Sequence, residues 1–344
     1  MRGGRKSRQK INKKQVVLLC MGGILALALI IGLMEAWDWM QGKSSEEPVR
    51  GDLTGRFEEP RTIEYDGKQY QYRKGLTTIL FMGVDHASEG EESGQGYRKG
   101  GQADFLMLVI LDEENKRLTP IQIDRDTMTE ITVLGILGNV AGTRRAQICL
   151  SHGFGDGGDQ SCEFTVDAVE KLFLGIDIDF YISMDMDGIS VLNDMLGGIE
   201  VTLEDDFSAL DPAMTKGTTL TLQGEQAEYY LRSRMNVGIG TNEARMERQN
   251  LYIDQAQQVL DAKIQEDVNF VGELYDELDP YLNTNMKRGR MINEAWASRD
   301  YERQSVISLQ GEHSLGEDGF MEFHPDEKAL EQLVLERFYE PGAQ

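Results

Sequence analysis

The sequence predicts a layered α/β domain preceded by one N-terminal transmembrane helix. Short apolar runs alternate with segments of helical spacing about 10–15 residues long, as in layered α/β domains. A separate run of 19 residues, at positions 16–34, contains no charged side chain. With 344 residues, of which 40% are hydrophobic and 27% charged, the chain is large enough to bury a packed core.

The N-terminal segments predict a membrane topology. Residues 16–34 as a helix would span about 28 Å, close to the thickness of the hydrocarbon layer. Trp37 and Trp39 follow at the interface, and residues 1–15 hold seven basic side chains and no acidic one. We therefore expect a basic cytoplasmic tail (1–15), a retained single-pass anchor in the cell membrane (16–34) and an extracellular remainder. A cleaved signal peptide is the alternative, but the run is long for one and residues 35–37 make a poor cleavage site.

The rest of the chain is strongly acidic. The formal net charge is −24, so the residues after position 15 carry −31. This balance argues against a nucleic-acid-binding protein. Cys20, Cys149 and Cys162 are the only cysteines, which excludes a disulfide-dense scaffold and a Cys-rich zinc module. For Cys149 and Cys162, which flank a glycine-rich loop, a disulfide and a pair of buried free thiols both stay open.

The elements follow in order along the chain. Residues 35–75 are polar, without a regular pattern, and predict a stalk before a folded domain at 76–340. Apolar runs predict strands at 77–85, on both sides of a turn at 113–116, from 179 and after 197. Helical spacing predicts helices at 166–174, 188–196, 224–232 and 326–338, and a long helix that begins with Asn242 as its cap.

Arginines are concentrated in two places of this acidic chain. Arg125 ends a predicted strand, and Arg232, Arg234, Arg245 and Arg248 lie between 232 and 248. The spacing of Arg245, Arg248 and Gln249 places them on one face of the first turns of the long helix. A helix N-terminus attracts anions, and guanidinium groups bind phosphate oxygens in pairs. These residues predict a phosphate or pyrophosphate pocket; surface ion pairs with Glu243 and Glu247 are the alternative.

Two carboxylates predict a metal site. Asp85 ends one predicted strand and Asp104 begins the next, and ligands of α/β sheets collect outside strand ends. Two carboxylates beside a phosphate suit Mg²⁺, which takes few protein ligands and completes its shell with substrate oxygens. Without the arginines nearby, ordinary loop carboxylates would be the simpler interpretation.

Six segments in this order resemble the LytR-CpsA-Psr family of cell-envelope phosphotransferases. They are ILFMGVD (79–85), ADFLMLV (103–109), IQIDRDTM (121–128), DMLGGIEV (194–201), LQGEQAEYYLRSR (222–234) and ARMERQ (244–249). The resemblance implies a three-layer α/β/α domain on a single mixed central sheet. It also implies transfer of a polyprenyl-pyrophosphate-linked glycopolymer, of teichoic acid or capsule type, to peptidoglycan, with pyrophosphatase as a side activity.

The resemblance also assigns roles residue by residue. Asp85 and Asp104 match the acids that bind Mg²⁺, with Mn²⁺ as an alternative. Catalytic roles fall to Arg125, Arg232 and Arg234. Pyrophosphate binding falls to a larger set, which consists of Arg125, Arg232, Arg234, Arg245, Arg248 and Gln249.

Three positions depart from the family's pattern. Gln102 stands where the family usually has arginine, Asp124 where it has proline, and Asn242 where it has aspartate. The departures keep a second interpretation open, in which the chain is a non-catalytic envelope regulator that binds a lipid pyrophosphate on the same fold.

Overall fold

The computed structural model describes residues 61–85, 100–135, 138–234, 237–238 and 240–342. The predicted tail, membrane helix and most of the stalk lie outside these residues. Within the described part of the chain, no helix is long and apolar enough to cross a bilayer.

Seven strands of the described residues form a mixed central sheet. Its order is β11-β8-β3-β4-β5-β12, and β13 also pairs with β5. β4 runs antiparallel to both β3 and β5, whereas β3 and β8 are parallel. The strands are β3 (Leu76–Val84), β4 (Ala103–Asp112), β5 (Arg117–Ile123), β8 (Phe180–Asp185), β11 (Leu282–Thr284), β12 (Glu302–Arg303) and β13 (Ile307–Ser308).

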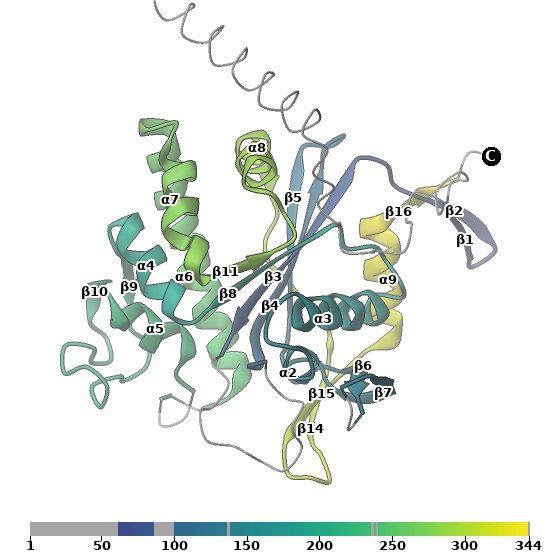
Figure 1. Ribbon diagram of the computed structural model, residues 1–344, viewed down its shortest axis with the longest axis horizontal. Coiled ribbons are helices and arrows are strands. Elements are labelled where there is room, and N and C mark those ends of the chain that lie inside the picture. Colours follow the sequence, from purple (N-terminus) through teal and green to yellow (C-terminus); the bar gives the residue numbers. More distant parts are fainter. Residues whose placement is uncertain (1–60, 86–99, 136–137, 235–236, 239, 343–344) are drawn as a thin grey trace, which may run out of the picture. The chain divides into compact units, whose positions relative to one another are not determined.

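Helices cover both faces of this sheet, so the domain has three layers (Figure 1). α3 (Asp159–Leu172) and α9 (Glu327–Phe338) pack on the face that carries Leu80, Leu108 and Ile121. The opposite face is next to the helices α4 (Asp187–Leu196), α5 (Glu225–Arg232), α6 (Asn242–Glu266), α7 (Phe270–Leu278) and α8 (Arg288–Ser298). A short helix α2 (Leu150–Gly153) precedes α3, and a 3₁₀ turn η2 (Asp279–Tyr281) follows α7. The predicted α/β class and mixed central sheet are confirmed.

Capping residues explain where several helices begin and end. The Thr241 side chain accepts a hydrogen bond from the Ala244 N–H, so the cap of α6 is Thr241 and the prediction that Asn242 is the cap was wrong by one residue. Asp326 caps α9 in the same way. α4 ends at Gly197, whose φ of 89° is a left-handed conformation that glycine adopts without strain.

Short strands outside the central sheet correct the predicted stalk. β1 (Thr62–Tyr65) and β2 (Lys68–Tyr72) pair with each other, and β2 pairs with β16 (Tyr339–Pro341), so the folded unit begins at Thr62 and not at 76. The stalk prediction missed a local signal there: Asp66 and Gly67, both at positive φ, form the two-residue turn between β1 and β2. Only the pairing of β2 with β16, some 270 residues away, lacks a local signal. The other small sheets are β6 (Met128–Leu134) with β7 (Val140–Gln147), β9 (Ile199–Thr202) with β10 (Thr219–Leu222), and β14 (Gly311–Leu315) with β15 (Met321–Pro325).

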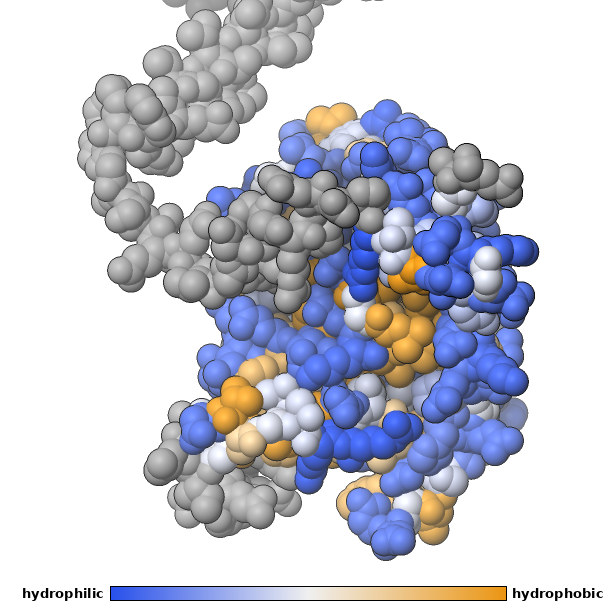
Figure 2. Space-filling view, turned by 90° about the vertical axis from the view of Figure 1, so that its right-hand side faces the viewer, coloured by the Kyte–Doolittle hydropathy of each residue, from blue (hydrophilic) through white to orange (hydrophobic). Residues whose placement is uncertain are grey.

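Hydrophilic side chains dominate the face on the side of α9 and the β1-β2-β16 sheet, with apolar areas between them (Figure 2).

Cys149 and Cys162 are buried free thiols, so of the two open alternatives the structure has the one without a disulfide. Burial raises the pKa of Cys149 to about 11 and that of Cys162 to about 12, and both stay protonated near neutral pH.

Candidate active site

Three strand ends bring the predicted acids and Arg125 to one edge of the sheet. Asp85 directly follows β3, Asp104 is the second residue of β4, and Arg125 comes two residues after β5. Because β4 is antiparallel to both neighbours, the end of β3, the start of β4 and the end of β5 lie together. The Asp85 N–H donates to the Gln102 carbonyl over 3.0 Å, which fixes this junction.

A glycine permits the close approach of Asp85 to the start of β4. A Cβ added at Gly101 would lie 1.4 Å from the Asp85 carbonyl oxygen, so no larger residue is accommodated there. The Gly101 carbonyl accepts a hydrogen bond from Nδ1 of His152 over 2.9 Å. Burial lowers the pKa of His152, so this histidine is neutral and supports the backbone of the site.

Arg125 sits in a tight turn between β5 and β6. The Asp126 N–H donates to Oδ1 of Asp124 over 2.8 Å, and the Thr127 hydroxyl donates to the Asp124 carbonyl over 2.6 Å. The guanidinium of Arg125 then reaches Asp104, the Gln102 side-chain oxygen and the Cys149 sulfur. The turn therefore points the guanidinium back across the start of β4.

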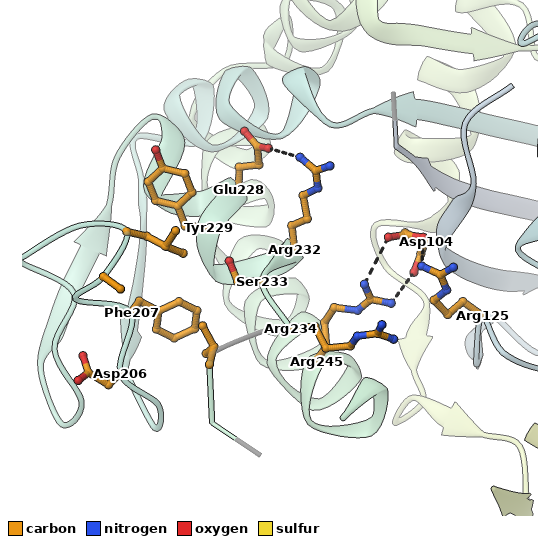
Figure 3. Close-up of a pocket in the computed structure, with 13 residues that line it drawn as sticks. Asp104, Arg125, Asp206, Phe207, Glu228, Tyr229, Arg232, Ser233, Arg234 and Arg245 are labelled. Carbon is orange, nitrogen blue, oxygen red and sulfur yellow. Dashed lines mark hydrogen bonds and ion pairs between the residues drawn. The ribbon is translucent and has the colours of Figure 1, made fainter. Parts of the chain in front are cut away.

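Asp104 lies between two arginines (Figure 3). One oxygen pairs with Arg125, and Oδ2 lies 3.4 Å from Nη1 of Arg245. The side chain of Arg245 is 4% exposed and donates over 2.5 Å to Oδ1 of Asn242, in the same turn of α6. Strand β4 and helix α6 are thus joined by a buried network of charged groups.

Arg232 and Arg234 complete the guanidinium cluster from the end of α5. Arg232 pairs with Asp85 over 2.5 Å and with Glu228 over 3.1 Å. Among the described residues, no side chain forms a hydrogen bond or ion pair with the Arg234 guanidinium. Arg234 is only partly buried, so its donors are available to a ligand.

Two cavities meet at these side chains. The arginine cavity has a volume of about 480 Å³ and is lined by residues that include Asp104, Arg125, Arg232, Arg234 and Arg245. The hairpin cavity, of about 900 Å³, extends from the same place toward the β14–β15 hairpin. Arg125 and Arg234 line both cavities. A ligand in one cavity is therefore within reach of groups that also face the other.

The electrostatics of the cluster favour an anion. Burial, followed by the charges of Arg125 and Arg234, lowers the pKa of Arg245, although Asp104 opposes this shift. Burial also lowers the pKa of Arg125, but Cys149, Asp104 and Asp126 outweigh it and the net shift is upward. The Nε atoms of Arg125 and Arg245 are buried and lack a hydrogen-bond partner. Phosphate oxygens would accept hydrogen bonds from the unused donors of Arg234 and offset the repulsion between the guanidinium groups.

Arg248 and Gln249 lie behind the cluster and are not among the residues that line either cavity. Arg248 donates to the Tyr230 carbonyl over 3.2 Å and to the Ser233 carbonyl, and Nη1 lies 3.3 Å from Asp205. Gln249 donates to the Leu231 carbonyl over 3.2 Å. Their contacts position the segment that carries Arg232 and Arg234. Direct contact of Arg248 and Gln249 with a pyrophosphate stays a prediction.

The donor set at the strand ends suits a magnesium ion. Asp85 and Asp104 offer hard carboxylate oxygens from adjacent strand ends, the ligands that Mg²⁺ or Mn²⁺ takes alongside substrate oxygens. The described residues contain no group of three or more His, Cys, Asp or Glu side chains placed to bind a metal. A metal held here would therefore depend on phosphate oxygens for the rest of its shell.

Sequence reasoning missed a set of polar contacts beside Arg125. Nδ2 of Asn242 donates to Oδ1 of Asp124 over 2.8 Å, so two of the three departures from the family pattern touch each other. Nε2 of His313, from β14, lies 3.0 Å from Oδ2 of Asp124. No local signal marks this pair, since 189 residues separate its members.

Comparisons with known proteins agree with this architecture. The sequence pattern of the LytR_cpsA_psr family matches residues 49–337. The polyisoprenyl-teichoic acid–peptidoglycan teichoic acid transferase TagV of Bacillus subtilis is 25% identical over 338 residues, covering 94% of this chain and 78% of that protein. The crystal structure of B. subtilis TagV matches with a TM-score of 0.56 at 25% identity, over 77% of this chain and 98% of that one. Protein gbs0355 of Streptococcus agalactiae shares the fold, with a TM-score of 0.62 at 24% identity over 76% and 87% of the chains.

Proposed function

Because this chain belongs to the LytR_cpsA_psr family, we propose that it is a membrane-anchored extracellular phosphotransferase. It attaches a polyprenyl-pyrophosphate-linked glycopolymer, of teichoic acid or capsule type, to peptidoglycan. The names of TagV and of TagU from Bacillus mycoides, which is 23% identical over 335 residues, support a teichoic acid as cargo and peptidoglycan as acceptor.

The observation that carries this proposal is the guanidinium cluster around Asp104. Arg125, Arg234 and Arg245 line one cavity together, and Arg234 has donors that no described side chain uses. Such a cluster binds the two phosphates of a pyrophosphate and neutralises charge that develops during phosphoryl transfer. Arg125, Arg232 and Arg234 are the residues to which we assign this catalytic role.

The reaction is a displacement at phosphorus. A sugar hydroxyl of the acceptor loses its proton and attacks the phosphorus that carries the glycopolymer. The bond to the bridging oxygen breaks, and polyprenyl monophosphate leaves with the electron pair. Arg125 and Arg234, which line both cavities, hold the reacting phosphate between donor and acceptor. Pyrophosphatase activity is the same displacement with water as the acceptor.

Asp85 and Asp104 would hold Mg²⁺, or Mn²⁺ in its place. Bound there, the metal supplies positive charge to the phosphoryl oxygens. The pairing of Asp85 with Arg232 and of Asp104 with Arg125 keeps guanidinium groups beside the carboxylates. The residues that bind the metal and those that bind phosphate thus form one connected cluster.

The placement at the membrane rests on the sequence, in which a basic tail precedes the uncharged run at 16–34. The prenyl chain is assigned to the sheet face next to α6 and α8. Phe105 follows Asp104 in β4 and, with Phe81 and Phe180, belongs to partly buried apolar residues on the sheet face next to α6 and α8. These side chains would place a prenyl chain beside the phosphates.

A single-turnover assay with a polyprenyl-pyrophosphate-linked polymer, a peptidoglycan acceptor and Mg²⁺ tests the proposal. We expect transfer by the wild type and its loss in Arg125→Ala and Arg232→Ala. Unchanged transfer in both variants would contradict the roles assigned here. Ligand binding without product would instead identify the non-catalytic regulator that binds a lipid pyrophosphate.

A further inference from the structure

A histidine–carboxylate pair lies in the hairpin cavity, outside the guanidinium cluster. Nε2 of His313 is 3.0 Å from Oδ2 of Asp124, and both His313 and Arg125 line the cavity. The His313 side chain is 34% exposed, whereas that of Asp124 is 6% exposed. The pair therefore has a buried carboxylate and an imidazole that solvent or a ligand can reach.

The contacts of Asp124 fix the tautomer of the imidazole. A carboxylate can only accept, so Nε2 of His313 carries the proton and Nδ1 has a free lone pair. The described residues include no hydrogen-bond partner for Nδ1. The other carboxylate oxygen, Oδ1 of Asp124, accepts from Asn242 and from the Asp126 N–H, both over 2.8 Å. The carboxylate is thus held in place from two sides while the base nitrogen of His313 is unused.

The same contacts connect the pair to the guanidinium cluster. Asn242 donates to Asp124 through Nδ2 and accepts from Arg245 through Oδ1. Backbone contacts dock the hairpin on the turn that carries Arg125, because the Phe323 N–H donates to the Asp126 carbonyl over 2.8 Å. The ring of Phe323 packs against His313 at 4.8 Å between centroids. The imidazole is therefore positioned relative to the phosphate-binding arginines.

We propose that His313 is the general base of the transfer, oriented by Asp124, and that the hairpin cavity binds the acceptor hydroxyl. This assignment rests on the proposed function. Nδ1 takes the proton of the sugar hydroxyl, whose oxygen bonds to phosphorus while the bond to the leaving polyprenyl phosphate breaks. His313 then releases the proton to solvent. Asp124 is a positioning residue that also stabilises the imidazolium.

Other charged groups face the same cavity, so the test must separate them from His313. They are Arg125, Asp126, Arg144, Arg234, Glu243 and Asp318. Asp126 is the main competitor as a proton acceptor, and burial raises its pKa, followed by the charge of Asp124. However, the Asp126 carboxylate lies 3.4 Å from Nε of Arg125 and its side chain is only 6% exposed, which leaves it less accessible than His313.

The decisive variant is His313→Gln in the full-length protein, measured by steady-state transfer between pH 5 and 9. The glutamine amide can still donate to Asp124 but has no base nitrogen. We expect kcat to fall about 100-fold or more, the range for removal of a general base, with KM for the lipid-linked donor unchanged. The fall in rate toward acid pH should disappear, and added imidazole should partly restore the rate of His313→Ala. Asp124→Asn should lower kcat less than His313→Gln and leave KM unchanged.

His324→Gln is the matched control. His324 lies on the same hairpin and faces a carboxylate at the same distance, with Nε2 3.0 Å from Glu322, but it does not line the cavity. This variant should behave as the wild type. Transfer by His313→Gln within twofold of wild type with the same pH profile, or a pH profile abolished only by Asp126→Asn, would overturn the assignment and leave the proposed function intact. Failure of the wild type to transfer at all would overturn both.

Discussion

The first and second turns of α6 carry arginines on one face, yet they serve different parts of the molecule. Arg245, in the first turn, lines the arginine cavity and faces Asp104 over 3.4 Å. Arg248, one turn later, faces Asp205 and donates to backbone carbonyls of residues 230 and 233. Spacing alone groups the two residues together. Their partner atoms separate a guanidinium that lines the cavity from one that packs inside the fold.

Among the variants that test this contrast, the largest effect is expected for Arg234→Ala. Its guanidinium forms no hydrogen bond or ion pair with a side chain of the described residues. Transfer, measured as kcat/KM, should fall about 1,000-fold because the group stabilises transition-state charge. The free energy of unfolding should stay within about 0.5 kcal/mol of wild type. Arg299→Ala, at an exposed arginine that pairs with its neighbour Asp300, is the control. If Arg234→Ala loses transfer only because it unfolds, Arg234 stabilises the fold as Arg248 does, and the role assigned to it in transfer is contradicted.

Asp104→Asn tests the carboxylate that the cavity arginines share. The amide keeps the shape but removes the charge between Arg125 and Arg245, so transfer should fall about 100-fold. Its dependence on Mg²⁺ concentration should also weaken. Asp112→Asn, at the other end of β4, serves as the control. A magnesium titration identical to that of wild type would contradict the role of Asp104 as a metal ligand.

Arg248→Ala should affect the fold rather than the chemistry. The variant removes the ion pair with Asp205 and the hydrogen bonds to two backbone carbonyls. Breaking a largely buried ion pair lowers the free energy of unfolding by about 3 kcal/mol. Urea denaturation should show this loss, while kcat/KM per folded molecule changes less than about threefold. If Arg248→Ala unfolds like the wild type but no longer transfers, Arg248 contacts the pyrophosphate directly, as the sequence predicted. The two turns of α6 would then serve the same function.

The smallest effect concerns the support behind Arg125, whose guanidinium donates to the Cys149 thiol over 3.2 Å. Burial raises the thiol pKa from 9.0 to about 11, so the folded state retains its proton longer than the unfolded state does. The protonated thiol therefore contributes about 2–3 kcal/mol to the free energy of unfolding. This contribution is complete below pH 9 and is lost as the pH rises from 9 through 11. Cys149→Ser should lose less stability over that interval. Equal slopes for wild type and variant would contradict a buried, protonated thiol.

Local pattern located the strand-end residues of the site. Apolar runs identified β3, β4 and β5, and strand ends located Asp85, Asp104 and Arg125, because burial of a strand leaves a direct signal in sequence. The separation of Arg248 from Arg245 was not predictable in this way. Both residues have the same spacing and charge, and only the packing of residues 230–233 against α6 distinguishes them.

Long-range pairing accounts for the elements that were missed. β14 is exposed along its length and lacks the alternation that marks a half-buried strand, so the hairpin that carries His313 has no sequence signal. The same holds for β7, most of whose residues are exposed. The contact between Asp124 and His313 arises only when these distant segments dock.

The central claim is that the arginine cavity binds the diphosphate of a prenyl-linked substrate. A crystal structure with a short-chain prenyl diphosphate tests it most directly. The account predicts phosphate oxygens within hydrogen-bonding distance of Arg125, Arg234 and Arg245, beside Asp104. A diphosphate bound at another surface, with these three guanidinium groups making no contact to it, would contradict the account.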